Sequence, residues 1–387
     1  MIYDYLQPVA ASFFENLSFK ESQLGSIVEF YTDQKFDFHE VDIAIIGIDE
    51  IRNAVGNTAT AEAPAAFRKE FLKLYTPVID RSIKIVDLGN IKTGANVRDT
   101  YFGLSSVLLH LLTHKVVPII IGGSHDNTYG QYLAYQELYA LINMVIIDEK
   151  IDLNEMQTSL TADSFMMSIL AHTPNYLFNY SHIGYQTYLN DKHAIEMLES
   201  LNFDCIRLGI ARQNLEDTEP HFRDADMLSI DMNCLRMADF PAHENASPNG
   251  FSGEELCQMA RFAGLSDKLS SIGFYEMNPA FDRNSQSSQL LAQAVWCFVE
   301  GYYQRKNDMP NKSSDFLKFT VKLDAYDHEL IFWKSKVTNR WWMELPFGEK
   351  KDLQKQQMVP CTFADYEQAC REEVPDRWMR VYHKLIS

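Results

Sequence analysis

The sequence predicts an α/β protein built as a three-layer sandwich, with a mostly parallel sheet of about eight strands between two layers of helices. Uninterrupted apolar runs recur along the 387 residues, and such runs are typical of strands buried on both faces of a parallel sheet. Segments with helical spacing separate these runs, and strand–helix alternation is the pattern of parallel α/β sheets. Three of the runs lead into Asp or His, which points to one shared site.

The first half of the chain alternates between strands and helices. The run VDIAIIGI (41–48) predicts the first buried strand, and SIKIVDLG (82–89) predicts the second. Between them, Pro64 suits the first turn of a helix over 64–76, where its missing N–H costs no hydrogen bond. Amphipathic spacing predicts two further helices, over 99–114 and 127–142, which precede the apolar strands VVPIIIGG and MVIID.

The second half repeats this alternation. Four more apolar strands are expected: HIGYQ (182–186), FDCIRLGI (203–210), MLSID (227–231) and LSSIGFYE (269–276). Helices are expected over 190–200, from Gly253 to about Gly264, and over 285–305. Glu254 and Glu255 favour the second of these helices, because acidic residues near a helix N-terminus interact well with its dipole.

The polar strand ends share one location in the predicted sheet. They are GGSHD (122–126), DEKID (148–152) and SIDMNCLRMADFP (229–241). In parallel sheets, ligands and metals bind beyond the carboxyl ends of the strands, so these carboxylates and the imidazole are expected to converge. Taken singly, each Asp could instead be a helix cap or a salt-bridge partner, and His125 could be a hydrogen-bonded core histidine.

These segments resemble the ureohydrolase family, which includes arginase, agmatinase and formiminoglutamase. The family carries Gly-Gly-Asp-His-Ser, Asp-Ala-His-x-Asp and Ser-x-Asp-x-Asp-x-x-Asp-Pro in this order. A fourth segment, FYEMNP (274–279), is similar to the family's Val-Glu-x-Asn-Pro. Order and spacing agree over roughly residues 40 to 305, so the resemblance implies the family's eight-stranded fold.

The resemblance implies a dinuclear metal site that has partly degraded. The six positions that hold two manganese ions in the family carry over to His125, Asp148, Lys150, Asp152, Asp231 and Asn233. Lys150 replaces a His and Asn233 replaces an Asp, and both substitutions fall on the same metal. The other site keeps its four ligands, which are His125, Asp148, Asp152 and Asp231.

The substitutions predict that the chemistry has changed. A protonated Lys has no lone pair for a cation, so Lys150 is expected to lie within salt-bridge distance of Asp148 or Asp231 and to replace the second ion's charge. The candidate catalytic residues are Asp148 and Asp231. Glu276 matches the family's glutamate that binds the guanidinium or amidine group, or it is a strand-end carboxylate paired with an Arg or Lys150.

Composition excludes several kinds of partner. Against 53 Asp and Glu there are 35 Lys and Arg, for a net charge of −18, which argues against nucleic acid and anionic membranes. No window is long enough for a membrane span, and the start lacks the features of a signal peptide. The six cysteines lack metal-ligand spacing, and reduced thiols predict a cytoplasmic protein.

The chain is expected to divide into an α/β domain (1–305) and an aromatic-rich extension (306–387) packed on it. MPNKSSD (309–315) is a polar linker, followed by three short strands and by one or two helices interrupted at Pro375. Trp333 and at least one of Trp341 and Trp342 are expected to be buried. The extension could also contact a second copy of the chain or another protein.

The sequence leaves three functions open. The first is a ureohydrolase-family protein whose hydrolysis of guanidino or formimino C–N bonds is impaired or lost. The second is an active hydrolase of a small guanidino or amidino compound that uses a single or atypical metal centre. The third is a non-catalytic binding or scaffold protein. The expected cofactor is at most one divalent ion, with manganese as the family's ion, or none.

Overall fold

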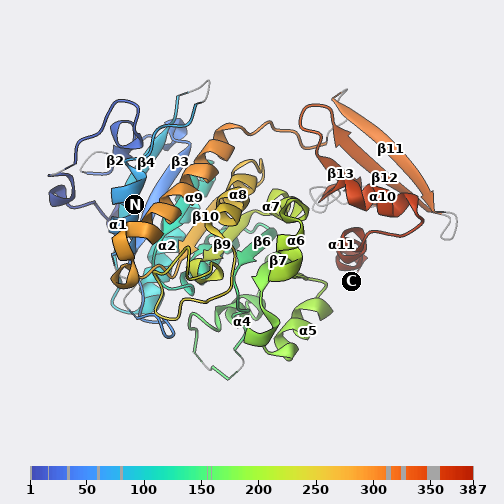
Figure 1. The fold of residues 1–387 in the computed structure, drawn as a ribbon, viewed down its shortest axis with the longest axis horizontal. Helices are drawn as coiled ribbons and strands as arrows, with labels where there is room; N and C mark the ends of the chain where they lie inside the picture. The colour runs from blue at the N-terminus through green and yellow to red at the C-terminus, as the bar shows by residue number, and fades with distance from the viewer. Residues whose placement is uncertain are drawn as a thin grey trace.

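The middle layer of the molecule is one ten-stranded sheet (Figure 1). The computed structural model describes residues 2–386 except 16, 33–34, 59–61, 79–81, 155, 158, 311–314, 324–327 and 347–357. The sheet strands in chain order are β1 (Leu6–Gln7), β2 (Glu29–Phe30), β3 (Ile43–Ile48), β4 (Ile85–Ile91), β5 (Val117–Ile121), β6 (Ile142–Ile147), β7 (Leu177–Tyr185), β8 (Asp204–Arg207), β9 (Met227–Asp231) and β10 (Ser271–Tyr275).

The sheet order is β1-β4-β3-β5-β10-β9-β6-β7-β8, and β2 also pairs with β4. Strands β3 to β10 pair in parallel, which confirms the predicted eight-stranded core. The two short strands β1 and β2 extend one edge, and β1 runs antiparallel to β4. The sequence did not predict these two strands, because each has only two residues and no apolar run.

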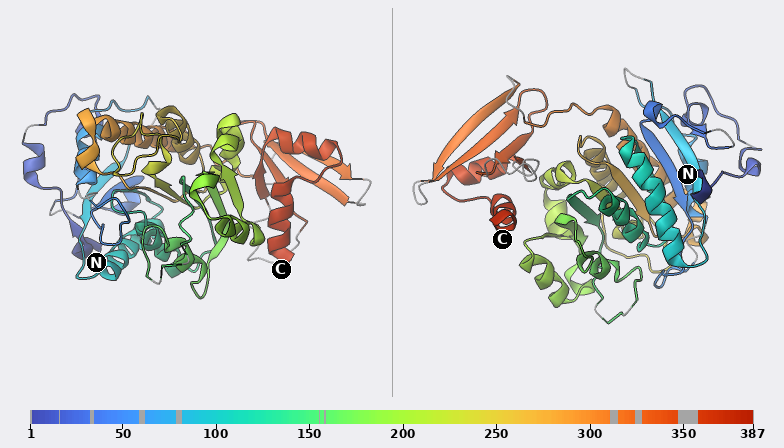
Figure 2. Two further views of the ribbon diagram at one scale, coloured as in Figure 1. Left: turned by 60° about the horizontal axis from the view of Figure 1, so that its bottom comes forward. Right: turned by 180° about the vertical axis from the view of Figure 1, so that it is seen from behind.

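Helices cover both faces of the sheet, as predicted. They are α1 (Ala63–Phe71), α2 (Val97–Thr113), α3 (Asn127–Glu137), α4 (Phe165–Leu170), α5 (Lys192–Ser200), α6 (Leu208–Gln213), α7 (Glu219–Asp224), α8 (Gly253–Gly264) and α9 (Gln286–Tyr303). Figure 1 shows α8 and α9 in front of the sheet, and the view from behind in Figure 2 shows α2 on the opposite face. Within the described residues, no helix has both the length and the apolar character needed to cross a bilayer.

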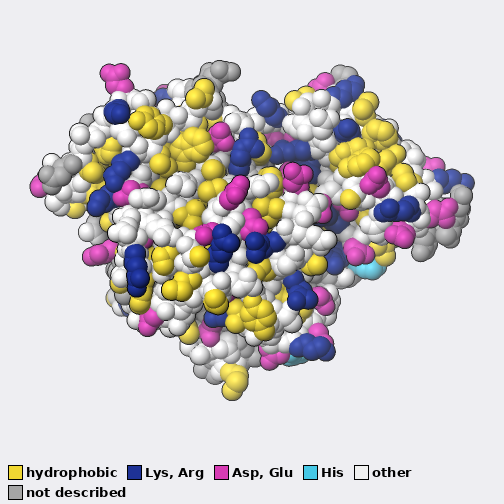
Figure 3. Space-filling model, in the orientation of Figure 1, with side chains coloured by type: hydrophobic (Ala, Val, Ile, Leu, Met, Phe, Trp, Pro, Cys, Tyr) yellow, Lys and Arg dark blue, Asp and Glu magenta, His cyan; other side chains and the backbone are white. Residues whose placement is uncertain are grey.

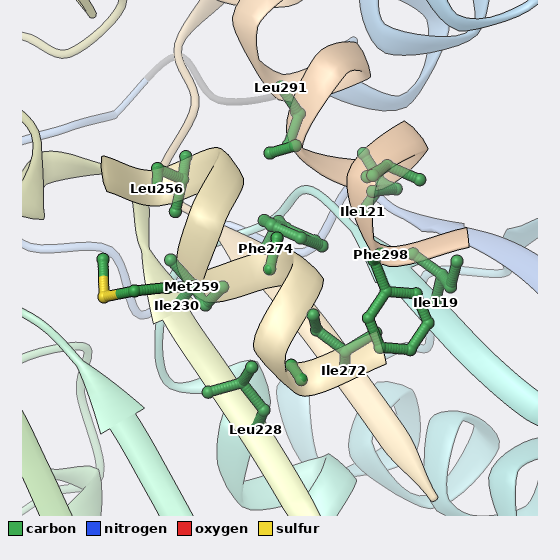
Figure 4. Close-up of a cluster of buried hydrophobic side chains, with 14 of the residues drawn as sticks. Ile119, Ile121, Leu228, Ile230, Leu256, Met259, Ile272, Phe274, Leu291 and Phe298 are labelled. Carbon is green, nitrogen blue, oxygen red and sulfur yellow. The ribbon is translucent and has the colours of Figure 1, made fainter. Parts of the chain in front are cut away.

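Alternating side chains on each strand fill the two cores. Ile119 and Ile121 of β5 point toward α8 and α9, whereas Ile120 between them packs with α2. Figure 4 shows the first core, in which side chains of β5, β9 and β10 meet Leu256, Met259 and Phe298 of the covering helices. Each fully buried side chain of this size contributes about 1.5–3 kcal/mol, so this interior holds the strands in place.

One predicted strand is wrong in part. The run FDCIRLGI (203–210) was expected to be a strand throughout, but β8 ends at Arg207 and α6 begins at Leu208. Leu208 and Ala211 are buried one helical turn apart, so the apolar residues here serve a helix face rather than a strand. By contrast, α8 begins at Gly253 as predicted, and Ser252 and Glu255 form a capping box at its start.

The C-terminal region forms a separate antiparallel sheet, which lies beside the α/β part in Figure 1. Its strands are β11 (Phe316–Leu323), β12 (His328–Ser335), β13 (Trp341–Glu344) and β14 (Met358–Cys361), followed by α10 (Phe363–Cys370) and α11 (Asp376–Ile386). The three predicted strands and the two helices are confirmed, and β14 is additional. Of the predicted linker, residues 311–314 lie outside the described residues. The division into domains at residue 305 remains a prediction.

Trp341 and Trp342 are buried, which confirms the expectation that at least one of them is, and Trp333 is partly buried within the single chain. Trp333 is only half-buried, because its indole donates to Glu344 Oε2 at 2.8 Å and Lys318 lies over its ring on the open side of the sheet. A partly wet position suits an indole, which has a polar N–H on an apolar body.

The buried Arg223 is one of the residues that join the extension to the α/β part. Arg223 of α7 donates to the carbonyl oxygens of Trp341 and Cys361, at 3.0 Å each, and its guanidinium stacks on Trp342. Where the two parts meet, Figure 3 shows Lys and Arg side chains mixed with Asp and Glu. The extension therefore contacts the α/β part through charge-assisted hydrogen bonds as well as apolar packing.

Candidate functional site

The candidate site lies at the carboxyl ends of four strands that are neighbours in the sheet. Strands β5, β10, β9 and β6 lie side by side in this order. Their ends lead into His125, Glu276, Asp231 and Asp148, respectively. The four sequence motifs therefore meet at one edge, as the parallel arrangement predicts.

Two glycines make the turn that presents His125. Gly122 and Gly123 have φ of +95° and +74°, in the left-handed region that favours glycine. A Cβ at Gly123 would also lie 2.9 Å from the carbonyl oxygen of Glu50. After this turn the backbone N–H of His125 donates to Glu276 Oε1 at 2.8 Å, which ties the end of β5 to the end of β10.

His125 faces three carboxylates with one ring nitrogen. Its Nδ1 lies 2.9 Å from Asp152 Oδ2, 3.4 Å from Asp148 Oδ2 and 3.7 Å from Asp231 Oδ2. On the other side of the ring, Nε2 lies 3.0 Å from the hydroxyl of Ser229. When Nε2 donates to this hydroxyl, Nδ1 keeps a lone pair that is directed at the carboxylates.

Three carboxyl groups lie close together in this site and repel one another. Burial raises the pKa of Asp148 to about 6, with repulsion from Asp152 adding to it, and burial raises the pKa of Asp152 to about 6 as well. Burial and Asp148 raise the pKa of Asp231 to about 8. Burial lowers the pKa of His125, but Asp148 and Asp152 outweigh burial and raise it well above its usual value. Three carboxylates therefore outnumber the single positive charge that the His125 imidazole can supply.

The cluster fits one divalent ion. His125 Nδ1 and Asp148 Oδ2 are buried and form no well-aligned hydrogen bond, although Asp152 Oδ2 lies 2.9 Å from Nδ1, and a buried polar atom without a hydrogen bond is costly. Within the described part of the chain, His125, Asp148 and Asp152 are the one set of three side chains whose ligand atoms lie close enough to share an ion. One imidazole nitrogen with carboxylate oxygens suits manganese or zinc.

The expectation for Lys150 is wrong. Lys150 is exposed, and no ion pair joins it to Asp148 or Asp231, all three of which are described residues. Its side chain instead lines a surface hollow beside Asp163 and Asp191. An ammonium group is strongly hydrated and its stem is long, so the charge reaches water from the strand end rather than entering the site.

Backbone amides take the place that we expected for the Lys150 ammonium. The N–H of Lys150 donates to Asp148 Oδ1 at 3.0 Å, and the N–H of Asn233 donates to Asp231 Oδ1 at 2.7 Å. Each carboxylate thus accepts from the residue two positions later, which is a common local arrangement for Asp. These bonds hold both carboxylates in orientation without a cation at position 150.

Asn233 is bound to a carboxylate that the sequence analysis missed. Its amide Nδ2 donates to Glu149 Oε1 at 2.9 Å, and Gln186 Nε2 donates to the other oxygen of Glu149 at 3.2 Å. Glu149 is buried, and burial raises its pKa while the Ser247 hydroxyl opposes the rise. The position that replaces an Asp thus serves as a hydrogen-bond donor to a neighbouring acid. Asn233 Oδ1 is buried without a partner.

Glu276 is held by the protein's own groups. Besides the His125 amide on Oε1, its Oε2 accepts from Asn57 Nδ2 at 2.8 Å. His243 Nε2 lies 3.8 Å from the same oxygen, and His243 Nδ1 accepts from the N–H of Asn245. Glu276 has a φ of +67°, a strained value for a residue with a Cβ, and its N–H donates to the Gly123 carbonyl. The pairing with Arg or Lys150 that we considered is not present among the described residues.

His243 and Asn57 also escaped the sequence analysis. His243 is 8% exposed and lines a surface hollow with Met237, Phe281 and Arg283. Burial lowers the pKa of His243, but Glu276 and then Asp231 outweigh burial and raise it. No apolar run leads into either residue, since both lie in loops that reach the site through tertiary packing. The sequence signal that could have indicated His243 is its place in the polar loop that directly follows the third motif, which ends at Pro241.

Comparisons with known proteins agree with this architecture. The model of the arginase family matches residues 41–300. The formimidoylglutamase of Staphylococcus haemolyticus is 25% identical over 262 residues, which cover 64% of this chain and 82% of that protein. The formimidoylglutamase of Staphylococcus carnosus is 25% identical over 293 residues, which cover 73% of this chain and 92% of that protein. A solved structure of Trypanosoma cruzi formiminoglutamase with Mn2+ has a TM-score of 0.67 at 18% identity, covering 73% of this chain and 99% of that chain. Bacillus subtilis formimidoylglutamase has a TM-score of 0.66 at 17% identity, covering 75% and 96%.

Proposed function

Because the chain belongs to the arginase family, we propose that it retains one of the family's two metal sites and has lost the other, with hydrolysis of guanidino or formimino C–N bonds impaired or absent. The hydrogen bond from Asn233 to Glu149 carries this proposal. An amide that donates to a buried acid supplies no negative charge to a second cation. Lys150, at the other substituted position, faces water.

The retained site would hold its ion through His125, Asp148, Asp152 and Asp231. A divalent ion bound there supplies Lewis acidity and lowers the pKa of a coordinated water. Ser229 holds the orientation of the His125 ring through Nε2, and the two backbone amides orient Asp148 and Asp231. Supporting groups of this kind determine ligand orientation and affinity. Asp148 and Asp231 are the residues that we propose as catalytic in any remaining hydrolysis.

Glu276 is the proposed substrate-binding residue. Its carboxylate could accept N–H groups of an amidine or guanidinium, but Asn57 and the His125 amide already donate to it. A cationic ligand would therefore compete with the protein's own donors at Oε2, where His243 also lies. This competition supports weak binding of the family's substrates, and it agrees with impaired turnover.

A second function, single-ion hydrolysis, is supported by His243. This imidazole lies beside Glu276 and at the wall of the surface hollow, where it could exchange a proton with a bound substrate. A non-catalytic binding protein remains the third possibility. We further propose a cytoplasmic location and a small amidino or guanidino ligand, with the extension as the surface for a second copy or another protein.

Metal content measured together with product release distinguishes these functions. Protein purified without chelators and equilibrated with Mn2+ is expected to hold at most one ion per chain and to release no urea, ammonia or formamide above background. Asp152→Asn should lower the metal content, whereas the matched surface change Asp163→Asn should not. Two ions per chain with rapid turnover would refute the proposal. One ion with turnover that His243→Gln removes would establish the single-ion hydrolase instead.

A further inference from the structure

A second polar cavity lies at the opposite edge of the main sheet, between the strand starts and the C-terminal extension. Asn143 is the second residue of β6, and Asp148 follows the same strand at its other end, about 16 Å away at 3.3 Å per residue. The described lining of the cavity also includes Ser181, Asp204 and His221 from the α/β part and Arg377 and Arg380 from α11. The extension contributes five of the fourteen described lining residues, and residues beyond 300 lie outside the family match.

An unsatisfied amide faces this cavity. The Asn143 side chain is 3% exposed, and neither its Nδ2 nor its Oδ1 has a hydrogen-bond partner. Its backbone groups are fully used, because its N–H donates to Asp226 Oδ2 and its carbonyl accepts from the Asp226 N–H. A buried amide with two unpaired polar atoms is rare in folded proteins; the Nδ2 donor points to a bound acceptor, whereas Oδ1 would need a separate donor.

Positive charge exceeds negative charge around Asn143. Arg380 pairs with Asp204, and Lys384 donates to Asn179 at the same interface. Arg377 donates only to the Pro360 carbonyl, at 3.5 Å, and no described carboxylate lies within ion-pair distance of it. Asp224, the other acid of the lining, is paired with Lys268. One guanidinium therefore faces the cavity without a counter-charge.

The titration behaviour of the lining agrees with this excess. Burial raises the pKa of Asp204, but His221, Arg380, Arg377 and Lys384 together outweigh burial and lower it. A buried carboxyl normally has a raised pKa, and because His221 is neutral near pH 7, the positive potential at Asp204 there comes from Arg380, Arg377 and Lys384. Burial, followed by Arg377, lowers the pKa of His221 to about 4, so His221 is neutral near pH 7 and its Nδ1 interacts with the Ser181 hydroxyl at 2.9 Å.

The size of the cavity limits the ligand. Its volume is about 20 Å³, which accommodates about one water-sized sphere. Most metabolites are excluded by this volume. A single-atom anion fits, and Asn143 Nδ2 and the Arg377 guanidinium are both hydrogen-bond donors without a strong acceptor.

We propose that this cavity binds one halide ion, chloride under physiological conditions, between the Asn143 amide and the Arg377 guanidinium. The ion joins a group of β6 to a group of α11, so its binding stabilises the contact between the α/β part and the extension. This site is independent of the candidate metal site, since it shares no residue with it.

The experiment compares the thermal unfolding of the full-length protein in sodium chloride and in sodium gluconate at equal ionic strength. Gluconate is too large for the cavity. Chloride is expected to raise the unfolding temperature saturably, by about 2–4 °C, since a ligand that binds only the native state stabilises it. Asn143→Leu and Arg377→Gln should remove the chloride response, whereas Arg371→Gln, on the exposed turn before α11, should keep it.

A second measurement does not depend on the variants folding. Crystals of the wild-type protein grown in sodium bromide are expected to show an anomalous peak between Asn143 and Arg377. Absence of that peak, or a water in its place, would overturn the proposal. So would an unfolding temperature that rises equally in gluconate, or a chloride response that Asn143→Leu retains in full.

Discussion

Restoring the second metal site requires a change at Glu149 as well as at the two substituted positions. In the double variant Lys150→His and Asn233→Asp, the new carboxylate would face Glu149, whose Oε1 now lies 2.9 Å from Asn233 Nδ2. Two unit charges about 4 Å apart repel by about 4 kcal/mol at an effective dielectric constant of about 20. That energy corresponds to a pKa rise of about 3 units, so one of the two acids would stay protonated or the side chains would separate.

Adding Glu149→Ala removes this repulsion. We expect the double variant to bind at most one Mn2+ per chain and to unfold at a lower temperature than the wild type. The triple variant should bind two ions. Elemental analysis after equilibration with Mn2+ and removal of free ion measures both, and Glu149→Ala alone serves as the control, with at most one ion. The reasoning would be refuted if the double variant bound two ions without loss of stability, or if the folded triple variant still bound one.

Three further predictions concern stability. Arg223→Met leaves two carbonyls of the extension without donors, and at about 1.5–3 kcal/mol for each bond to a charged group it should cost about 3–6 kcal/mol in urea unfolding. Deleting residues 306–387 exposes Arg223 and the apolar surface under the extension, so the remaining chain should aggregate or melt well below the full chain, as gel filtration and calorimetry would show. Because the pKa of His221 is lowered to about 4, below its unfolded value near 6.5, the unfolded state binds more protons between these values and stability falls as pH drops from 6.5 to 4. His221→Gln should flatten this loss, which amounts to about 3 kcal/mol in unfolding free energies measured at pH 7 and pH 4.

Each of these predictions has a contrary result. An Arg223→Met protein as stable as the wild type would show that the Arg223 hydrogen bonds do not stabilise the contact with the extension. A truncated protein that is monodisperse and melts with the full chain would make the extension an independent appendage. For His221, an unchanged acid limb in the variant would assign the acid sensitivity to other groups.

The sequence predicted the fold well wherever apolar runs determine structure. Strands β5, β6, β9 and β10 are buried on both faces, so their composition alone identifies them, and their parallel pairing explains why their ends meet. Short edge elements lack that signal, which is why β1 and β2 were missed. The apolar run that contains β8 continues into helix α6, and the periodicity of so few residues does not distinguish a strand from a helix.

The candidate site was predicted in part for a similar reason. The residue types and the order of the motifs along the chain predicted that His125, Asp148, Asp152 and Asp231 lie together, because these residues follow neighbouring strands. The direction of a side chain is a different matter. Whether Lys150 enters the site or reaches water depends on hydration and on competing donors, and the partner of Asn233 is Glu149, 84 residues away in the chain. Contacts between loops that are far apart in the chain leave no recognisable pattern in the local sequence.

The link through Arg223 also bears on the order of events during synthesis. The carbonyls that Arg223 binds belong to Trp341 and Cys361, so this guanidinium stays uncovered until the chain has been made as far as Cys361. At about 5–20 residues per second, the ribosome needs roughly 3–11 s for residues 306–361. During this interval Arg223 keeps its ion pair with Glu219 of the same helix but lacks its two carbonyl acceptors, and the apolar surface around it stays exposed. A chaperone that recognises such surfaces has seconds in which to bind, and the closing of β13 and β14 over Arg223 is the step that ends its access.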